Sequence, residues 1–141
     1  MDTRVSASTI IKTLSVLVLL LTISACTTNR YVNSPAEDHE RFRCAIEEDI
    51  CGIQFSVGHV AYKVHKIADN KYRTVGEVRF NPDATGDLHV TFYMLFMDDK
   101  QVVFERRVKT ATADGTFDFE VETPKPVTAS TLANVRLMIR S

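Results

Sequence analysis

The sequence predicts a mainly β fold, a small antiparallel β-sandwich of the immunoglobulin or transthyretin kind with one short N-terminal helix after a signal peptide. Three observations indicate this fold. Apolar and polar residues alternate from Ile53 onward, turn-forming residues separate the alternating segments, and no long helical pattern lies between them. We therefore expect strands at 53–60, 61–67, 72–80, 88–97, 101–109, 116–122 and 132–140.

The segments between these strands have the composition of turns. Asn, Asp, Gly and Pro are concentrated between the apolar stretches, where they favour chain reversal. We expect one loop and three turns, at 81–87, 68–71, 98–100 and 113–115. Such short connections favour antiparallel neighbours over parallel ones.

Two of the expected strands have one apolar and one polar face, which is typical of a sheet with one face on the core and the other exposed to solvent. In 116–122, apolar residues alternate with acidic ones. If the preceding strand pairs with this one, Arg107 and Lys109 lie opposite Asp118 and Glu120 in a ladder of charges. The apolar face of the last strand consists of Val135, Leu137 and Ile139.

The composition and charge describe one ordinary globular domain. The chain has 141 residues, of which 45% are hydrophobic and 25% charged, and this excludes a multidomain assembly and a disordered chain. Its 17 Lys and Arg residues are balanced by 18 Asp and Glu residues, for a net charge of −1. This balance leaves no excess of positive charge to attract the phosphates of a nucleic acid, so we expect no nucleic-acid partner.

The segment 1–25 has the pattern of a secretory signal peptide. Arg4 and Lys12 precede an apolar run at 14–23, and small residues follow this run. Ten helical residues span about 15 Å, or roughly half the hydrocarbon core of a bilayer, so the run is too short for a permanent membrane span. We therefore exclude 1–25 from the fold.

The end of this segment is more specific than a general cleavage site. Ile23, Ser24 and Ala25 precede Cys26, and this run resembles the lipobox of bacterial lipoproteins. The resemblance implies that Cys26 is diacylated, becomes the acylated N-terminus and anchors the protein, since several acyl chains give stable anchoring. It also implies the outer membrane, periplasmic side, because Thr27 stands where lipoproteins kept in the inner membrane of enteric-type bacteria typically have Asp. The alternative is ordinary cleavage after Ala25, which leaves a free thiol.

The rest of the chain divides into a tether and a domain. The segment 26–36 is polar, contains a proline and lacks apolar periodicity, so we interpret it as the lipidated N-terminus and a flexible tether. The periplasmic domain then covers 37–141. At its start, good helix formers and the helical spacing of the apolar residues predict one amphipathic helix over 37–49.

Cys44 and Cys51 are the two remaining cysteines, and we predict a disulfide between them because export places the domain in an oxidising compartment. Seven helical residues separate two α-carbons by more than about 10 Å, whereas a disulfide needs less than about 7 Å. The helix must therefore break between Ile46 and Cys51. The alternative is a metal site in which both thiolates are joined by His39 or His59.

The expected strand 88–97 is apolar on both faces, and its second face consists of Tyr93, Leu95 and Met97. One explanation is a central strand whose second face is covered by the 37–49 helix. The other is an exposed apolar patch that binds a partner protein. Under the second explanation these three residues are the candidate partner-binding residues.

No motif in the chain predicts an active site. It has neither a nucleophile elbow nor a glycine-rich phosphate loop, so we expect no catalytic residues, no metal ligands and no cofactor. The segment 81–87 spaces oxygen-bearing side chains like a calcium loop, but Phe92 stands where the bidentate glutamate belongs, which favours an ordinary turn. We expect His39 and His89 on the surface. The alternative is an enzyme whose site combines His59 and His89 with acidic residues.

These features favour a non-enzymatic function at the cell envelope. We predict a membrane-anchored periplasmic lipoprotein that binds protein as an accessory of an envelope assembly of the secretion or pilus type, through the Tyr93 face or a strand edge. Its partners would be the membrane, reached through the N-terminal lipid, and an envelope protein. Three alternatives stay open: a module that binds a small hydrophobic ligand, an inhibitor of a periplasmic hydrolase, and a structural envelope lipoprotein.

Overall fold

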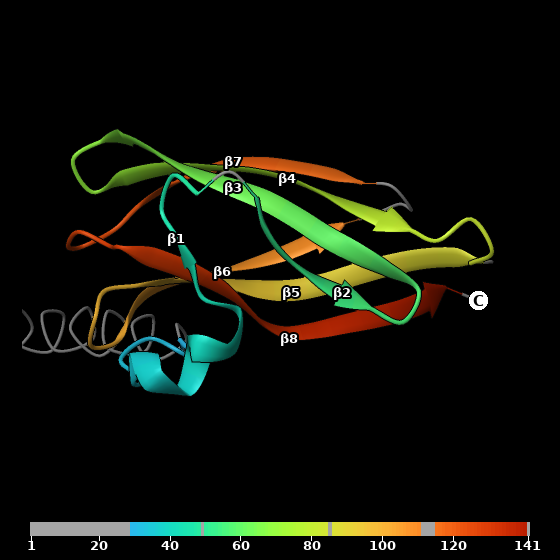
Figure 1. Cartoon of the computed structure of the whole chain (residues 1–141), viewed down its shortest axis with the longest axis horizontal. Helices are drawn as coiled ribbons and strands as arrows, with labels where there is room; N and C mark the ends of the chain where they lie inside the picture. The colour runs from blue at the N-terminus through green and yellow to red at the C-terminus, as the bar shows by residue number, and fades with distance from the viewer. Residues whose placement is uncertain (1–28, 49, 85, 111–114, 141) are drawn as a thin grey trace, which may run out of the picture. The chain divides into compact units, whose positions relative to one another are not determined.

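A computed structural model describes residues 29–48, 50–84, 86–110 and 115–140 of the chain (Figure 1). The chain divides into two compact units, Met1–Arg30 and Tyr31–Ser141, and the fold described below is that of the second unit. The predicted signal peptide and Cys26 lie outside the described residues. Within the described ranges, no helix has the length and apolar character needed to cross a membrane.

The described residues form two four-stranded antiparallel sheets that lie on one another as layers (Figure 1). The strand order is β1-β8-β5-β6 in one sheet, called the β5 sheet here, and β2-β3-β4-β7 in the other, called the β3 sheet. The elements are η1 (Ala36–Phe42, a 3-10 helix), β1 (Cys44–Ala45), β2 (Cys51–Phe55), β3 (Gly58–Ala68), β4 (Lys71–Phe80), β5 (Asp87–Met97), β6 (Val102–Thr110), β7 (Thr116–Glu122) and β8 (Ala129–Arg140). The predicted mainly β fold and antiparallel sandwich are confirmed.

One predicted strand boundary is wrong. The first reversal of the sandwich falls at Ser56 and Val57, where β2 turns into β3, rather than between 60 and 61. The apolar alternation runs through this turn and hides it. Gly58 starts β3 directly after this turn, and a side chain there would collide with the backbone carbonyl of Arg79, so the close approach of β4 needs a glycine at this position.

The main core lies between the two sheets. Phe92, Met94 and Phe96 of β5 project into it and are fully buried, as is Tyr72 of β4. The ring of Phe92 meets that of Phe117 edge to face, with centroids 5.6 Å apart. Both core clusters of the second unit, and its disulfide, consist of residues from Tyr31 onward. This unit therefore has its own core and folds as an independent domain.

The predicted charge ladder between β6 and β7 is wrong, because the chain passes from one sheet to the other between these strands. β7 pairs with β4 instead. Arg73 Nε donates to Asp118 Oδ1 at 2.9 Å, and Lys71 Nζ lies 3.6 Å from Glu120 Oε2. The hydrogen bonds from Arg73 lower the pKa of the Asp118 carboxyl.

A β-bulge in β8 redirects its side chains. Tyr93 of β5 pairs with Ala133, but Thr91 pairs with Arg136, so that one extra residue of β8 lies between the two pairs. Asn134 takes a left-handed conformation at this point, with φ of 52°. The bulge turns Val135 toward the core and Arg136 to the outer face of the β5 sheet.

The predicted helix over 37–49 is wrong in type and extent. The observed helix is η1, which is interrupted at His39 (φ −125°, ψ 22°) and ends at Phe42. Cys44 then pairs with Ser130 of β8 as part of β1. A continuous helix would hold the two cysteine α-carbons more than about 10 Å apart.

The predicted disulfide between Cys44 and Cys51 is confirmed, with α-carbons 5.8 Å apart. Cys44 belongs to the β5 sheet and Cys51, through its pairing with Tyr62, to the β3 sheet. The disulfide therefore joins the two layers covalently at one edge. Beside it, the hydroxyls of Tyr62 and Ser130 form a second link between the layers, 3.2 Å long.

The buried Tyr62 hydroxyl predicts a loss of stability at alkaline pH. Burial raises the pKa of Tyr62 to about 12 from its ordinary value of 10.0. Between these values the unfolded chain releases the proton while the folded domain retains it, so stability falls as pH rises through this range. We expect Tyr62 to account for about 1 kcal/mol of loss by pH 11.

Urea unfolding at pH 9 and pH 11 measures this loss. Other groups also titrate in this range, so the comparison is with Tyr62→Phe, which lacks the titrating hydroxyl and should lose less stability over the same pH interval. Equal losses in both proteins would contradict the assignment.

Candidate functional site

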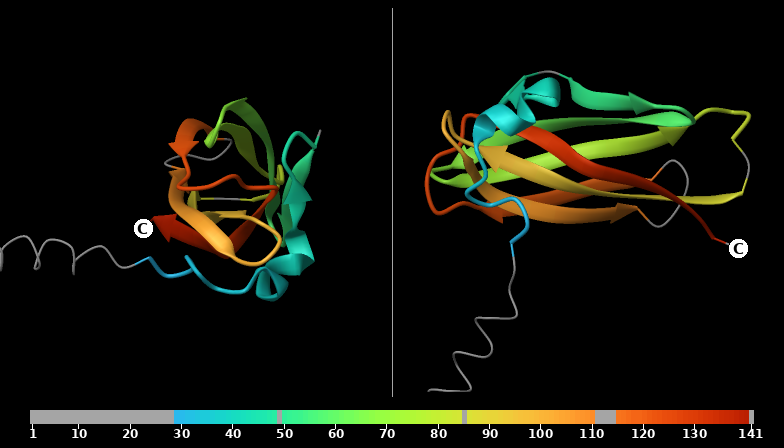
Figure 2. Two further views of the ribbon diagram at one scale, coloured as in Figure 1. Left: turned by 90° about the vertical axis from the view of Figure 1, so that its left-hand side faces the viewer. Right: turned by 90° about the horizontal axis from the view of Figure 1, so that it is seen from below.

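The three candidate partner-binding residues lie on the outer face of the β5 sheet, but they do not form an exposed patch. Leu95 and Met97 are fully buried, and Tyr93 is half-buried. The segment 31–36, called the strap here, crosses this face (Figure 2). Within the strap, Ala36 packs beside Leu95 and Met97, and the ring of Tyr31 lies edge-on to Tyr93 at 5.4 Å. Of the two explanations for the apolar second face of this strand, an exposed patch is therefore wrong, and the face is covered.

The strap is held mainly by hydrogen bonds between backbone groups. The N–H of Asn33 donates to the carbonyl of Val102, and the N–H of Val102 donates to the carbonyl of Ser34, each at 2.9 Å. Glu105 Oε1 accepts from the N–H groups of Tyr31 and Val32 at 2.7 and 3.2 Å. The structured unit thus begins at Tyr31 rather than at residue 37, and the predicted tether is correspondingly shorter. The strap also takes the covering role that we had expected of the 37–49 helix.

The histidines considered for a catalytic site are on opposite sides of the sandwich. His59 lies on the outer face of the β3 sheet, and His89 lies on the outer face of the β5 sheet. His89 is buried, with Nε2 3.4 Å from a carboxylate oxygen of Asp87 and Met138 as its neighbour on β8. The expectation of a surface position is wrong for His89. The separation of the two histidines excludes a site that combines them.

The acidic residues after β1 support the fold. Glu47 accepts a hydrogen bond from the backbone N–H of Lys66 at 2.6 Å and lies 3.4 Å from His65 Nδ1. The hydrogen bond from Lys66 lowers the pKa of the Glu47 carboxyl. Glu48 accepts from the N–H of Ala45 at 3.1 Å. These carboxylates connect the loop after β1 to β3 and to its own backbone.

The alternative of a metal site fails because its two cysteine ligands form the disulfide. Across the described residues, the grouping close enough for a shared ion consists of Cys44, Glu48 and Cys51. Both of its sulfur atoms belong to the disulfide, so neither is available as a thiolate. His39 instead contacts the hydroxyl of Ser34 at 2.9 Å. The segment 81–87 contains Thr85, which lies outside the described residues, so its resemblance to a calcium loop stays untested.

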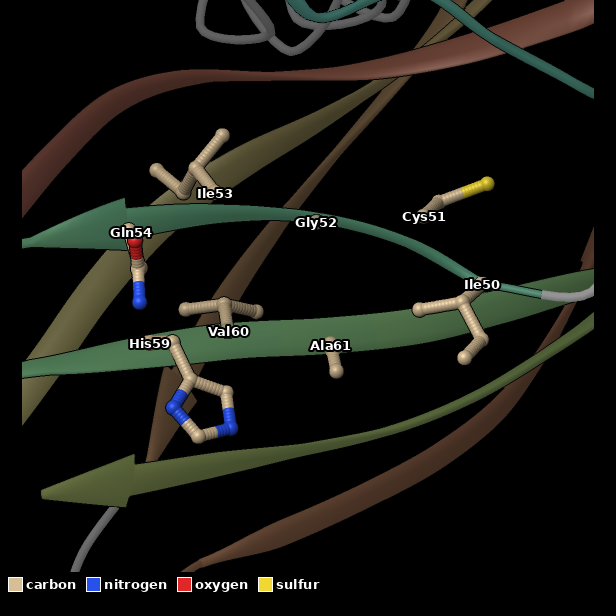
Figure 3. Close-up of a pocket in the computed structure, with 8 residues that line it drawn as sticks. All are labelled: Ile50, Cys51, Gly52, Ile53, Gln54, His59, Val60 and Ala61. Carbon is tan, nitrogen blue, oxygen red and sulfur yellow. The ribbon is translucent and has the colours of Figure 1, made fainter.

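Two shallow hollows lie on the outer face of the β3 sheet. One, of about 450 Å³, has its floor at Gly52 and Ala61, which are cross-strand partners, with Gln54 and His59 at one end and Ile50 at the other (Figure 3). The second, of about 540 Å³, lies beside it and shares Ile50 and Ala61. Both are outside the sandwich, whereas the described interior is packed with fully buried side chains. This packing weakens the alternative of a hydrophobic ligand held between the sheets.

The edge of the β5 sheet at β8, called the free edge here, is the place where the described sandwich most clearly lacks a neighbouring strand. In the described residues, β1 is the strand next to β8 on this side, and it pairs with Ala129 and Ser130 alone. The remaining residues of β8, 131–140, have no described strand beside them on this side, and alternate residues among them direct their backbone N–H and C=O groups away from β5. Thr131 and Leu132 are buried, and η1 lies close to β8, so the open part of the edge is the stretch after Leu132. Leu137 and Ile139 lie here with 39% and 69% of their surface exposed, although their partners on β5, Val90 and Leu88, are buried. The free edge is therefore both unpaired and apolar.

Sequence alternation predicted that Leu137 and Ile139 face inward, but it could not show that this part of β8 lacks a neighbouring strand. One feature of the sequence could have indicated this open edge. The segment that contains Cys44 and ends before Cys51 is short, so it cannot form a strand long enough to pair with the whole of β8. Comparisons with protein-family models, with curated proteins and with solved structures find no match to this chain. Its function is therefore inferred from its own residues.

Proposed function

We propose that this protein is a lipid-anchored component of the bacterial outer membrane, on the periplasmic side, and that its sandwich binds an envelope protein by accepting a strand at the free edge of β8. In this role it is a non-enzymatic accessory of an envelope assembly of the secretion or pilus type. The free edge of β8 is the observation that carries the binding proposal, because unpaired N–H and C=O groups are a template for a partner strand.

The anchor is supported by two features of the sequence. The run from Ile23 to Cys26 resembles a lipobox, and it follows a basic and then an apolar segment. The disulfide between Cys44 and Cys51 suits the oxidising conditions of the periplasm. Acylation at Cys26 would leave the domain tethered rather than embedded.

The chemistry of the edge defines the partner strand. Leu137 and Ile139 project from β8 on the core side of the sheet, because they are cross-strand partners of Val90 and Leu88. A strand added beside β8 would cover both side chains with its own inward-facing residues. The strand that fits here is therefore alternating, with apolar residues on the side that faces the core.

The anchor is tested with Cys26→Ala in cells. We expect this variant to lose acyl labelling and to leave the membrane fraction, because the acceptor of the lipid is gone. The matched control is the disulfide variant Cys44→Ala/Cys51→Ala, which should remain acylated and in the membrane. An acylated, membrane-bound Cys26→Ala protein would overturn the lipobox assignment.

The edge is tested with a photo-crosslinking residue at position 137 and a second one at Glu120, on the outer face of the β3 sheet. We expect one dominant envelope protein to be captured from 137 and not from 120. Adding Ile139→Lys should abolish this adduct, since an inward-pointing charge on an edge strand opposes strand addition.

The control for this substitution is Ile67→Lys, which places the same charge on another exposed isoleucine, at the end of β3. It should leave the adduct unchanged. Both isoleucines are exposed, so each variant should keep its stability within about 0.5 kcal/mol. An adduct that survives Ile139→Lys would contradict strand addition at this edge.

A further inference from the structure

The two outer faces of the sandwich differ in how their cations are paired. On the β3 sheet, carboxylates contact the basic side chains, in the pairs Lys71 with Glu120, Arg73 with Asp118 and Arg79 with Glu77. On the β5 sheet, Arg107, Lys109 and Arg136 are exposed, and no carboxylate among the described residues contacts them. An overall charge of −1 therefore conceals one face with unpaired positive charge.

The strand register places these three cations together. Lys109 and Arg136 are the two neighbours of Thr91 across the sheet, and Arg107 is the neighbour of Tyr93 on β6. Directly opposite residues share a face, and adjacent strands lie about 4.8 Å apart, so Lys109 and Arg136 are separated by about two strand spacings. Met138 extends the surface as an apolar residue, with 43% of its area exposed.

The nearby carboxylates have other partners. Glu105 precedes Arg107 by two residues on the same face of β6, but its Oε1 accepts hydrogen bonds from the strap. Asp87 lies 3.4 Å from His89. Since these acids are engaged elsewhere, the field of the three cations is directed outward from the sheet.

The proposed anchor would place this face next to the membrane, and the inference rests on that part of the proposed function. Four residues lie between Cys26 and Tyr31. Five extended residues span at most about 17 Å, so an acylated Cys26 lies within that distance of Tyr31. Tyr31 packs against Tyr93, the strand neighbour of Arg107, on the outer face of the β5 sheet. The β3 sheet is on the far side of the sandwich, about 10 Å farther away.

We propose that Arg107, Lys109 and Arg136 form a docking surface for anionic phospholipid headgroups, which holds the β5 sheet against the membrane. Each Lys or Arg near an anionic leaflet strengthens binding about fivefold, so three together supply a factor on the order of 100. Met138 enters the interface between headgroups and acyl chains. The free edge of β8 then lies along the membrane surface, open to a partner that is confined to the same plane.

The first test uses residues 31–141, which have their own core, with vesicles of phosphatidylcholine alone or with added phosphatidylglycerol. We expect binding to the anionic vesicles only, and loss of binding at high salt. The combined variant Arg107→Gln/Lys109→Gln/Arg136→Gln should reduce the partition coefficient on the order of 100-fold.

The matched control is Lys71→Gln/Arg73→Gln/Arg79→Gln, which removes the same charge from the β3 sheet and should bind almost as well as the unmodified domain. Equal losses in the two variants, or no dependence on phosphatidylglycerol, would overturn the proposal. Because this fragment has no acyl chain, a failure here leaves the anchor unaffected, and a failure of the Cys26→Ala test leaves this result unaffected.

Orientation is measured on the full chain in anionic vesicles that contain brominated lipid. The sequence has no tryptophan, so one introduced residue reports alone. Met138→Trp and Val75→Trp compare the two outer faces at similar exposure, 43% and 40%. We expect quenching of the first variant only. Equal quenching of both, or quenching of neither, would contradict a membrane-facing β5 sheet.

Discussion

Replacing Phe92 by alanine is expected to lower the free energy of unfolding by about 3–5 kcal/mol. The side chain is fully buried at the centre of the β5 sheet and meets the ring of Phe117 from the opposite sheet. Gly76 of β4 leaves space for that second ring, because a side chain there would overlap it. Removal of Phe92 therefore opens a cavity where both layers meet, and neither layer can collapse into it without moving Phe117.

Denaturant unfolding of the variant measures this loss. The matched control is Phe42→Ala, because Phe42 is 42% exposed at the end of η1 and belongs to neither core cluster. We expect the control to lose less than about 1 kcal/mol. Similar losses in the two variants would contradict the position of Phe92 in the core.

Removing the disulfide is expected to cost about 2.5 kcal/mol, the chain-entropy value for so short a loop. The expected variant is Cys44→Ala/Cys51→Ala, since both positions are buried and alanine adds no polar group to them. The loss should be accompanied by weaker protection of β1 from hydrogen exchange, because β1 pairs with only two residues of β8 and the disulfide begins at the first of its residues, Cys44.

Unfolding of the unmodified domain with and without reductant provides the comparison. The reduced domain and the double alanine variant should have similar midpoints, both below that of the oxidised domain. Thiol labelling before reduction should leave both cysteines unmodified. A double variant as stable as the oxidised domain would show that the disulfide contributes nothing to stability.

The strands could be predicted because their alternation depends on which residues face the core. In β7, Phe117 and Val121 are buried while Asp118 and Glu120 are exposed, as the sequence pattern indicates. The disulfide could be predicted because exclusion of Cys26 leaves two cysteines, and the predicted export would place them in an oxidising compartment.

The order of the strands could not be predicted in the same way. Alternation shows which face of a strand is apolar, but it does not show which strand is its neighbour. Asp118 therefore pairs with Arg73 rather than with Arg107, and the free edge of β8 appears only once the sheet order is known. The strap was missed because its hydrogen bonds to Val102 and Glu105 involve backbone N–H groups, which leave no apolar periodicity in the sequence.

The strap has a mechanical consequence for a domain that is pulled from its N-terminal end. Tension would load the hydrogen bonds of Tyr31 and Asn33 before it reached the sandwich. Peeling all six strap residues would lengthen the connection by up to about 20 Å. The Cys44–Cys51 bond lies beyond the strap and would keep the two layers joined. The strap would therefore yield first under load, while the folded sandwich beyond it stays intact.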